Sequence, residues 1–202
     1  MTTALLDCEY FPSIAWFQQF NRADLICIEQ YEYFERRSFR NRCHIAGANE
    51  MITLSVPLLG GRNQKCIMKD IKISYEEDWR PKHWKTIASA YKNSPYFDYF
   101  EAEVHSFFQQ KPAFLMDLNL QSLQLIQRIL QHKKNYSLST CYVLQPDNDT
   151  KDFRQSFSTQ SLFVDENLPK YWQTFQDRNG FLPNLSMLDI LFCCGQETLS
   201  LI

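Results

Sequence analysis

The sequence predicts an α/β protein whose Rossmann-like sheet opens with a βαβ unit and is followed by a helical middle and a C-terminal helix. Three patterns predict this fold. Residues 4–28 read as strand, turn, helix and strand. Residues 79–132 carry apolar side chains at helical spacing. Residues 186–195 combine a capping-box pattern, an apolar run and a final glycine, as a helix with both ends marked would. At 202 residues, we expect a single domain over 1–202.

The opening unit begins with a short, partly apolar strand over residues 4–10. A turn follows at Phe11-Pro12-Ser13, where the serine is a favourable N-cap for a helix over residues 14–20. Residues 25–28 are a continuous apolar run, which is typical of a strand buried on both faces. Together these segments predict two parallel strands joined by one helix.

Glu29 follows the second of these strands directly. Ligands of open α/β sheets tend to bind outside the carboxyl ends of the strands. Glu29 is therefore placed where a catalytic or orienting carboxylate would be useful. It could equally be a strand-end charge that pairs with a nearby arginine.

A basic stretch, residues 36–44, contains four of the arginines and a histidine. If it is a strand, alternate side chains share a face, and that face carries Arg36, Ser38, Arg40, Arg42 and His44. Such a row could hold phosphate or carboxylate groups, because these match the guanidinium fork. It could also be a solvated edge strand whose arginines discourage edge-to-edge pairing.

The next segments read as more strands. A Gly-Ala-Asn turn at residues 47–49 separates the basic stretch from a strand over residues 51–58, so the pair reads as a hairpin. The loop at residues 60–63 lacks the spacing of a phosphate-binding loop, and we expect simple flexibility there. Residues 67–74 alternate apolar and polar side chains, which predicts another strand.

A helix is expected over residues 79–93, capped by Asp78. Its polar side carries Lys82 and Lys85, with His83 at the boundary of the apolar face. A histidine in that position is most often a packed, hydrogen-bonded residue. The alternative is a general base, because the neighbouring lysine charges would lower the imidazole pKa and keep the ring neutral.

The rest of the chain continues with helices marked by phenylalanines over residues 97–108 and by leucines over residues 119–132, the latter starting at Asn119. Residues 136–144 are β-prone and predict a strand that returns to the sheet. Residues 151–177 are aromatic but weakly periodic, so we expect an irregular wrap with a short helix near Pro169. In the final helix, Asp189 is expected to act as a cap.

Composition limits the function classes. The formal net charge of −2 and pI near 6.1 argue against broad nucleic-acid binding and favour a small anionic ligand at a local basic patch. The apolar runs are too short to span a bilayer, and the first residues lack a signal-peptide pattern. Seven cysteines without C-x-x-C spacing predict reduced thiols in a cytoplasmic protein, with no metal site. No motif names a cofactor.

Five blocks in order resemble the WbqC-like family. They are Tyr10-Phe11-Pro12, Arg40-Asn41-Arg42, Lys82-His83-Trp84-Lys85 with Tyr91, Ser94-Pro95-Tyr96-Phe97, and residues 185–192 with Gly195. The resemblance covers nearly the whole chain. It implies surface-polysaccharide (O-antigen-type) biosynthesis and a glycine-transferase type of activity. The chain departs from the commoner family pattern at Cys8-Glu9 and by lacking a Gly/Ser-rich loop between residues 142 and 182.

The opening unit is also similar to nucleotidyltransferases of the pantothenate-synthetase type. Those enzymes carry paired histidines at the start of the first helix. This chain has Ile14-Ala15-Trp16-Phe17 there, so the similarity implies the fold and not the chemistry.

Two functions are consistent with these patterns. The first is a transferase that attaches an acyl or aminoacyl group, such as glycine, to a sugar or nucleotide-sugar. In it His83 or Glu29 would be the general base. Its expected substrate-binding residues are Tyr10, Arg40, Asn41, Arg42, Lys82 and Lys85. The second is a non-catalytic nucleotide- or partner-binding module that uses aromatic side chains among Tyr31, Tyr33 and Phe34.

Overall fold

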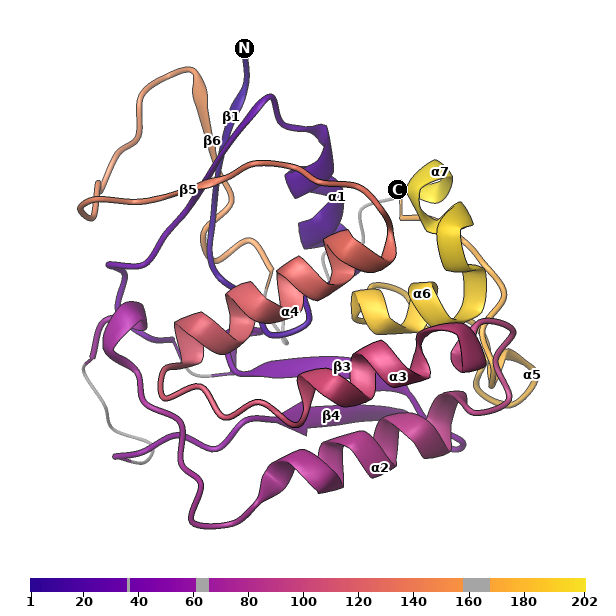
Figure 1. Cartoon of the computed structure of the whole chain (residues 1–202). Coiled ribbons are helices and arrows are strands. Elements are labelled where there is room, and N and C mark those ends of the chain that lie inside the picture. Colours follow the sequence, from indigo (N-terminus) through magenta and orange to yellow (C-terminus); the bar gives the residue numbers. More distant parts are fainter. Residues whose placement is uncertain (36, 61–65, 158–167) are drawn as a thin grey trace.

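A computed structural model describes residues 1–35, 37–60, 66–157 and 168–202, and it combines one parallel sheet, one hairpin and a largely helical second half (Figure 1). Two predicted features, Arg36 and most of the loop at residues 60–63, lie outside the described residues. The elements in chain order are β1 Thr3–Leu6, α1 Ile14–Arg22, β2 Leu25–Ile28, β3 Arg42–Ala46, β4 Met51–Ser55, the 3₁₀ turn η2 Met68–Asp70, α2 Trp79–Tyr91, α3 Phe97–Phe107, α4 Leu115–Ile129, β5 Ser137–Leu138, β6 Thr150–Asp152, α5 Gln176–Asn179, α6 Met187–Cys194, η3 Gly195–Glu197 and α7 Thr198–Leu201.

The protein has the predicted α/β fold. Its four-stranded sheet has the order β5-β2-β1-β6, and every pair in it is parallel. Thr3 pairs with Leu25 in β2 on one side and with Thr150 in β6 on the other. Helix α1 connects β1 to β2, so the βαβ opening is confirmed. Numbered along the chain, the parallel strands have the order 3-2-1-4, which matches the start of a Rossmann sheet. The strand order therefore reverses between β1 and β6.

The hairpin β3–β4 forms a second layer, and α4 runs between it and the sheet (Figure 1). Asn119 of α4 ties the layers together, because its amide nitrogen donates to the carbonyl of Cys8, 2.9 Å away, and to that of Arg40, 2.7 Å away. Helices α2 and α6 pack on β3 from the other directions. The helical middle and the C-terminal helix are confirmed.

The core is dominated by aromatic rings around the turn between β1 and α1. Tyr10, Phe11, Trp16, Phe17 and Phe20 are all essentially inaccessible. Burial of each such side chain contributes about 2 kcal/mol or more to stability. Phe11 has φ of 43°, a strained value for a bulky residue, and its backbone is held by hydrogen bonds to two serine hydroxyls from α4 and from the cap of α6.

Several strand boundaries differ from the prediction. The first strand ends at Leu6, because the backbone then turns away and Tyr10 N–H donates to Phe39 instead. The basic stretch is not a strand before Arg42, so the predicted common face of alternating arginines does not exist. The strand predicted over residues 51–58 ends at Ser55.

Two predictions for the middle of the chain are wrong. Residues 67–74 form η2 and isolated bridges at Ile67, Lys72 and Ile73, because their backbone groups bond to loops. Helix α4 begins at Leu115, so Asn119 is an interior residue and not the start. The polar side chain of Asn119 is stable in the core because its amide donates hydrogen bonds to the carbonyls of Cys8 and Arg40.

The last third keeps little of its predicted β-structure. The strand expected over residues 136–144 is reduced to β5. The segment expected to be an irregular wrap, residues 151–177, starts within β6, and its residues 158–167 lie outside the described residues. The short helix expected near Pro169 is α5, further along the chain. At the end of the chain, Ser186 caps α6 as predicted, and Gly195 terminates it with a φ of 59°.

Candidate functional site

Arg42 opens β3 and retains an uncompensated charge. Its Cα is paired with Ser55 of β4, and the side chain is half-buried. The Nε atom is buried without a hydrogen-bond partner, and no carboxylate within the described ranges forms an ion pair with the guanidinium. The charge is felt locally, because it adds to burial in lowering the pKa of His44. Arg42 is therefore able to accept an anion.

His83 lies on the buried face of α2, inside a ring of aromatic side chains. Its Nδ1 is 3.1 Å from the hydroxyl of Tyr10, and its ring packs edge-on against Trp79, with centroids 4.8 Å apart. Burial lowers the pKa of His83 to about 4, against the opposing effect of a hydrogen bond with the Ser55 backbone. The imidazole is therefore neutral at pH 7. The predicted cause, the flanking lysines, is not what lowers this pKa.

Ser55 is linked to both residues through its backbone. Its Cα pairs with Arg42 across the hairpin, and its backbone hydrogen-bonds His83. Asn41 lies at the same end, where its side-chain amide donates to the carbonyl of Val56, 2.9 Å away. We call Tyr10, Asn41, Arg42, Ser55 and His83 the hairpin site. A guanidinium without an ion pair in the described part of the chain can bind an anion, and a neutral imidazole can accept a proton.

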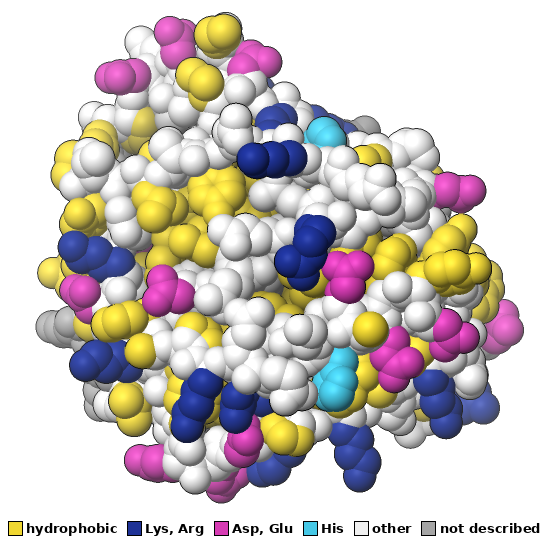
Figure 2. Space-filling view, viewed as in Figure 1, with side chains coloured by type: hydrophobic (Ala, Val, Ile, Leu, Met, Phe, Trp, Pro, Cys, Tyr) yellow, Lys and Arg dark blue, Asp and Glu magenta, His cyan; other side chains and the backbone are white. Residues whose placement is uncertain are grey.

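The two lysines beside His83 lie on the opposite face of α2. Lys82 is 70% exposed at its side chain and pairs with Glu77, 2.9 Å away, while Lys85 is exposed. In Figure 2, basic and acidic side chains are interspersed over the visible face of the molecule. The predicted Lys-His-Trp-Lys cluster is thus divided between the core and the solvent.

Arg40 is fully buried and its charge is already compensated. Its Nη2 is 2.7 Å from Glu32 and 3.4 Å from Asp7, and its Nη1 is 3.7 Å from the exposed Glu35. Three carboxylates around one guanidinium leave little attraction for an added anion. Arg40 is therefore part of a buried ion cluster with these carboxylates.

The carboxylates of this cluster were missed by the sequence analysis. Burial raises the pKa of Asp7 despite the opposing charge of Arg40, and it raises that of Glu9 well above its usual range. Burial raises the pKa of Glu32 to about 7. Their positions in the sequence could have indicated a place at the carboxyl edge of the sheet, because Asp7 and Glu9 follow β1 and Glu32 follows β2.

Glu29 follows β2 and is buried at the carboxyl edge of the sheet. It accepts hydrogen bonds from the Ser139 hydroxyl at 2.6 Å and from the Tyr31 backbone at 2.7 Å, and it lies 3.4 Å from Nη1 of Arg154. Arg154 also holds Asp152 at the end of β6. The arginine that pairs with this strand-end charge therefore follows β6, which is separated from β2 by β1, and does not come from the basic stretch.

Asp189 is a second residue whose surroundings the sequence did not predict. Ser186 provides the cap, and the fully buried Asp189 carboxylate instead accepts the hydroxyls of Tyr91 at 2.7 Å and Tyr171 at 2.6 Å, and the amide of Gln173 at 3.1 Å. Burial raises the pKa of Asp189, against the effect of these hydrogen bonds. This network joins α2, α6 and the loop before α5.

The absence of metal-binding and membrane-spanning features concerns residues 1–35, 37–60, 66–157 and 168–202. That part of the chain has no group of three or more His, Cys, Asp or Glu side chains suited to a metal ion. None of its helices combines the length and the apolarity needed to cross a bilayer. The seven cysteines, all of which are described, are free thiols, and Cys193 is buried beside the half-buried Cys194.

Comparisons with known proteins agree with the resemblance seen in the sequence. Residues 8–159 match the model of the WbqC-like protein family. No curated protein and no solved structure matches the chain. The matched segment spans more than half of the chain and contains the complete hairpin site, whereas the block at residues 185–195 lies beyond it. The chain therefore belongs to the WbqC-like protein family.

Proposed function

We propose that the chain is a transferase that attaches an acyl or aminoacyl group, such as glycine, to a sugar or nucleotide-sugar in surface-polysaccharide biosynthesis. One observation carries the proposal: the half-buried guanidinium of Arg42 has no carboxylate partner in the described part of the chain and lies at the strand pair that also holds His83. A buried charge without a partner is costly unless a ligand supplies the opposite charge. Family membership is compatible with this proposal.

In the proposed reaction Arg42 holds a phosphate or carboxylate of the substrate through paired N–H bonds. Neutral His83 accepts the proton of the attacking hydroxyl or amine, which forms the new bond to the acyl carbon of an activated acyl donor. The bond from that carbon to the donor's leaving group breaks, and the leaving group departs with the electron pair. The Tyr10 hydroxyl fixes the orientation of the imidazole ring. Asn41 borders the bound group. Glu29 is the second candidate for the base, and its bonds to Ser139 and Arg154 suit it better to orienting a substrate at the sheet edge.

The remaining predicted residues have supporting roles. Arg40 balances the charge of the buried carboxylates of Asp7 and Glu32. Lys82 and Lys85 project into solvent and would attract a phosphorylated substrate at long range, which is an effect that salt screens.

Calorimetric titration with uridine diphosphate and a uridine-diphosphate sugar tests the proposal. Arg42→Gln is expected to weaken binding at least tenfold, because charge-assisted hydrogen bonds contribute about 1.5–3 kcal/mol. Arg128→Gln is the matched control, since Arg128 is an exposed arginine paired with Glu103, and it should bind like the wild type. Equally weak heats for all three proteins would remove the basis of the proposal.

A non-catalytic binding module is the alternative, and the exposure of Tyr33 favours it. Tyr33 is 69% exposed, whereas Tyr31 is half-buried under the Lys69 ammonium, 4.2 Å from its ring centre. Tyr33→Ala would abolish partner binding in this alternative and leave nucleotide-sugar binding unchanged. In the transferase proposal, His83→Gln should instead lower turnover at saturating substrate without weakening substrate binding.

A further inference from the structure

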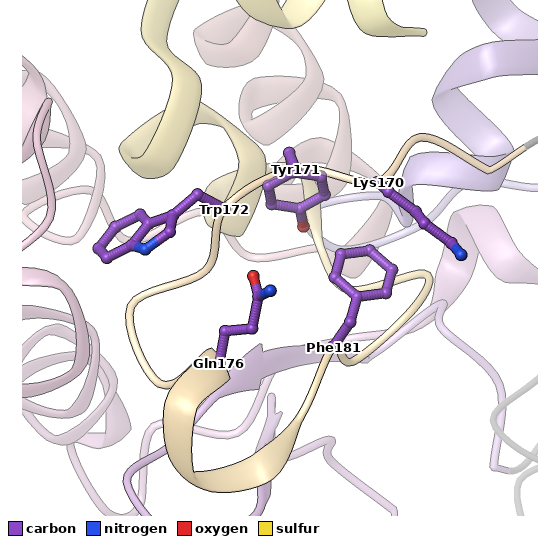
Figure 3. Close-up of a pocket in the computed structure, with 5 residues that line it drawn as sticks. All are labelled: Lys170, Tyr171, Trp172, Gln176 and Phe181. Atoms are coloured by element: carbon purple, nitrogen blue, oxygen red, sulfur yellow. The ribbon is translucent and has the colours of Figure 1, made fainter.

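A shallow hollow of about 340 Å³ lies on the C-terminal part of the chain, beyond the residues that match the family model. It is lined by Lys170, Tyr171, Trp172, Gln176 and Phe181 (Figure 3). In Figure 1, α5 lies on the same side of the molecule as α6 and α7, away from the connection between β5 and β6. Its lining shares no residue with the hairpin site.

The loop that carries the hollow is held by one buried and two partly buried hydrogen bonds. Gln173 closes it, because its side chain both donates to the carbonyl of Leu182 and accepts from the backbone N–H of Leu182, each at 2.9 Å. Tyr171 is anchored by its hydroxyl on Asp189, and its ring meets Phe181 edge-on with centroids 5.6 Å apart. A loop held in this way is pre-organised, which reduces the entropy lost on binding.

Trp172 stands between these two anchored residues and is 52% exposed. The other three tryptophans of the chain, Trp16, Trp79 and Trp84, are buried or half-buried. A large apolar ring held in water on a rigid loop has an unused stacking face. Rigid exposed aromatic side chains of this kind are typical anchors of binding sites.

The polar groups of the lining define the charge of a suitable ligand. Lys170 is exposed and has no ion-pair partner in the described ranges, and none of the described residues that line the hollow is a carboxylate. Gln176 points into the hollow in Figure 3, and its amide oxygen accepts the backbone N–H of Gln173 at 3.3 Å. Its amide nitrogen remains available to donate to an acceptor at the edge of a ring.

We propose that this hollow binds a planar ring carrying an anionic group, the chemistry of a mononucleotide. The ring stacks on Trp172, its edge accepts a hydrogen bond from Gln176, and the phosphate pairs with Lys170. Stacking of a base on an aromatic side chain and pairing of phosphate with lysine are both common in proteins that bind nucleotides. The inference goes beyond the proposed function, because it concerns a second site with its own residues.

Titrations of the full chain with adenosine monophosphate, adenosine and ribose 5-phosphate test the three parts of this recognition. In the Arg42→Gln variant, which lacks the anion ligand of the hairpin site, we expect the monophosphate to bind most tightly, adenosine to bind more weakly and ribose 5-phosphate not to bind. Trp172→Ala should weaken the binding of adenosine monophosphate about tenfold, within the range measured for base stacking. Lys170→Ala should weaken the monophosphate several-fold and leave adenosine unchanged.

The controls separate this site from the hairpin site and from general surface effects. Tyr99→Ala removes another exposed ring, on α3, and Lys133→Ala removes another exposed ammonium, and neither should affect binding. Arg42→Gln should leave the site on the hollow intact, so failure of the proposed function is distinguishable from failure here. The inference is overturned if the monophosphate does not bind at millimolar concentration, if Trp172→Ala binds it normally, or if ribose 5-phosphate binds equally well.

Discussion

Arg40 and Arg42 are two positions apart, yet their guanidinium groups have opposite surroundings. Arg40 points into the core, where Asp7 and Glu32 lie within 3.4 Å, and Arg42 lies in the hairpin without a carboxylate partner in the described part of the chain. The sequence singled out both as anion ligands. It could not separate them, because the partners of Arg40 lie after two different strands. The availability of an arginine is set by such distant partners.

Replacing Arg40 should be strongly destabilising. Arg40→Ala would leave Asp7 and Glu32 buried without their cation, and breaking a buried ion pair costs about 3–5 kcal/mol. Arg128→Ala removes an arginine from an exposed pair and should cost less than about 1 kcal/mol. Urea unfolding monitored by circular dichroism measures both values. Similar losses for the two variants would show that the buried cluster does not depend on Arg40.

At the scale of elements, the helices could be predicted better than the strands. Helices α1, α2 and α3 carry their own signals, namely a cap or an apolar stripe at helical spacing. Strands β5 and β6 have two and three residues, and their partners are β2 and β1 from the start of the chain. Pairs so distant in sequence leave almost no local pattern. The sequence therefore predicts the βαβ unit and misses the strand β6 that completes the sheet.

The end of α6 depends on two properties of Gly195, its φ of 59° and its contact with Tyr96. A Cβ at Gly195 would lie 2.5 Å from the Tyr96 ring, whereas a Cβ at Gly180, with a φ of 69°, meets nothing within 4 Å. Gly180→Ala should therefore lower the free energy of unfolding only through backbone strain at positive φ, by about 1–3 kcal/mol. Gly195→Ala should cost at least about 1 kcal/mol more, because the ring must also move. Thermal unfolding of both variants compares them, and equal losses would rule out the role of the Tyr96 contact.

At the scale of the whole molecule, buried carboxylates at the carboxyl edge of the sheet couple stability to pH. Burial raises the pKa of Glu32 to about 7 from an unfolded value of 4.5, so the folded state keeps a proton that the unfolded state has lost. Its contribution to the free energy of unfolding therefore falls as pH rises from about 4.5 to 7 and is constant above. His83 acts oppositely, because burial lowers its pKa to about 4 from 6.5, and stability is lost as pH falls through that window.

Comparison of the wild type with Glu32→Gln isolates the carboxylate. Between pH 4.5 and 7 the wild type should lose about 3 kcal/mol of stability relative to Glu32→Gln. The loss amounts to about 1.4 kcal/mol for each pH unit. Urea unfolding at closely spaced pH values gives this difference directly. Glu103→Gln, which changes a surface carboxylate, should show a difference that varies little with pH. A flat profile for Glu32→Gln would contradict the raised pKa.

The amino-acid sequence predicts the βαβ opening and the main helices, and it singles out every residue that we assign to the hairpin site except Ser55, because caps, periodicity and motif spacing act over a few neighbouring positions. Which of these residues are available depends on contacts that form in the folded chain. The fold surrounds Arg40 with carboxylates, buries His83 against Tyr10, turns Lys82 to solvent and presents Trp172 on a fixed loop. The availability of a side chain depends on its burial and on the charges around it, and both are set by groups that are close in space and far apart in the chain.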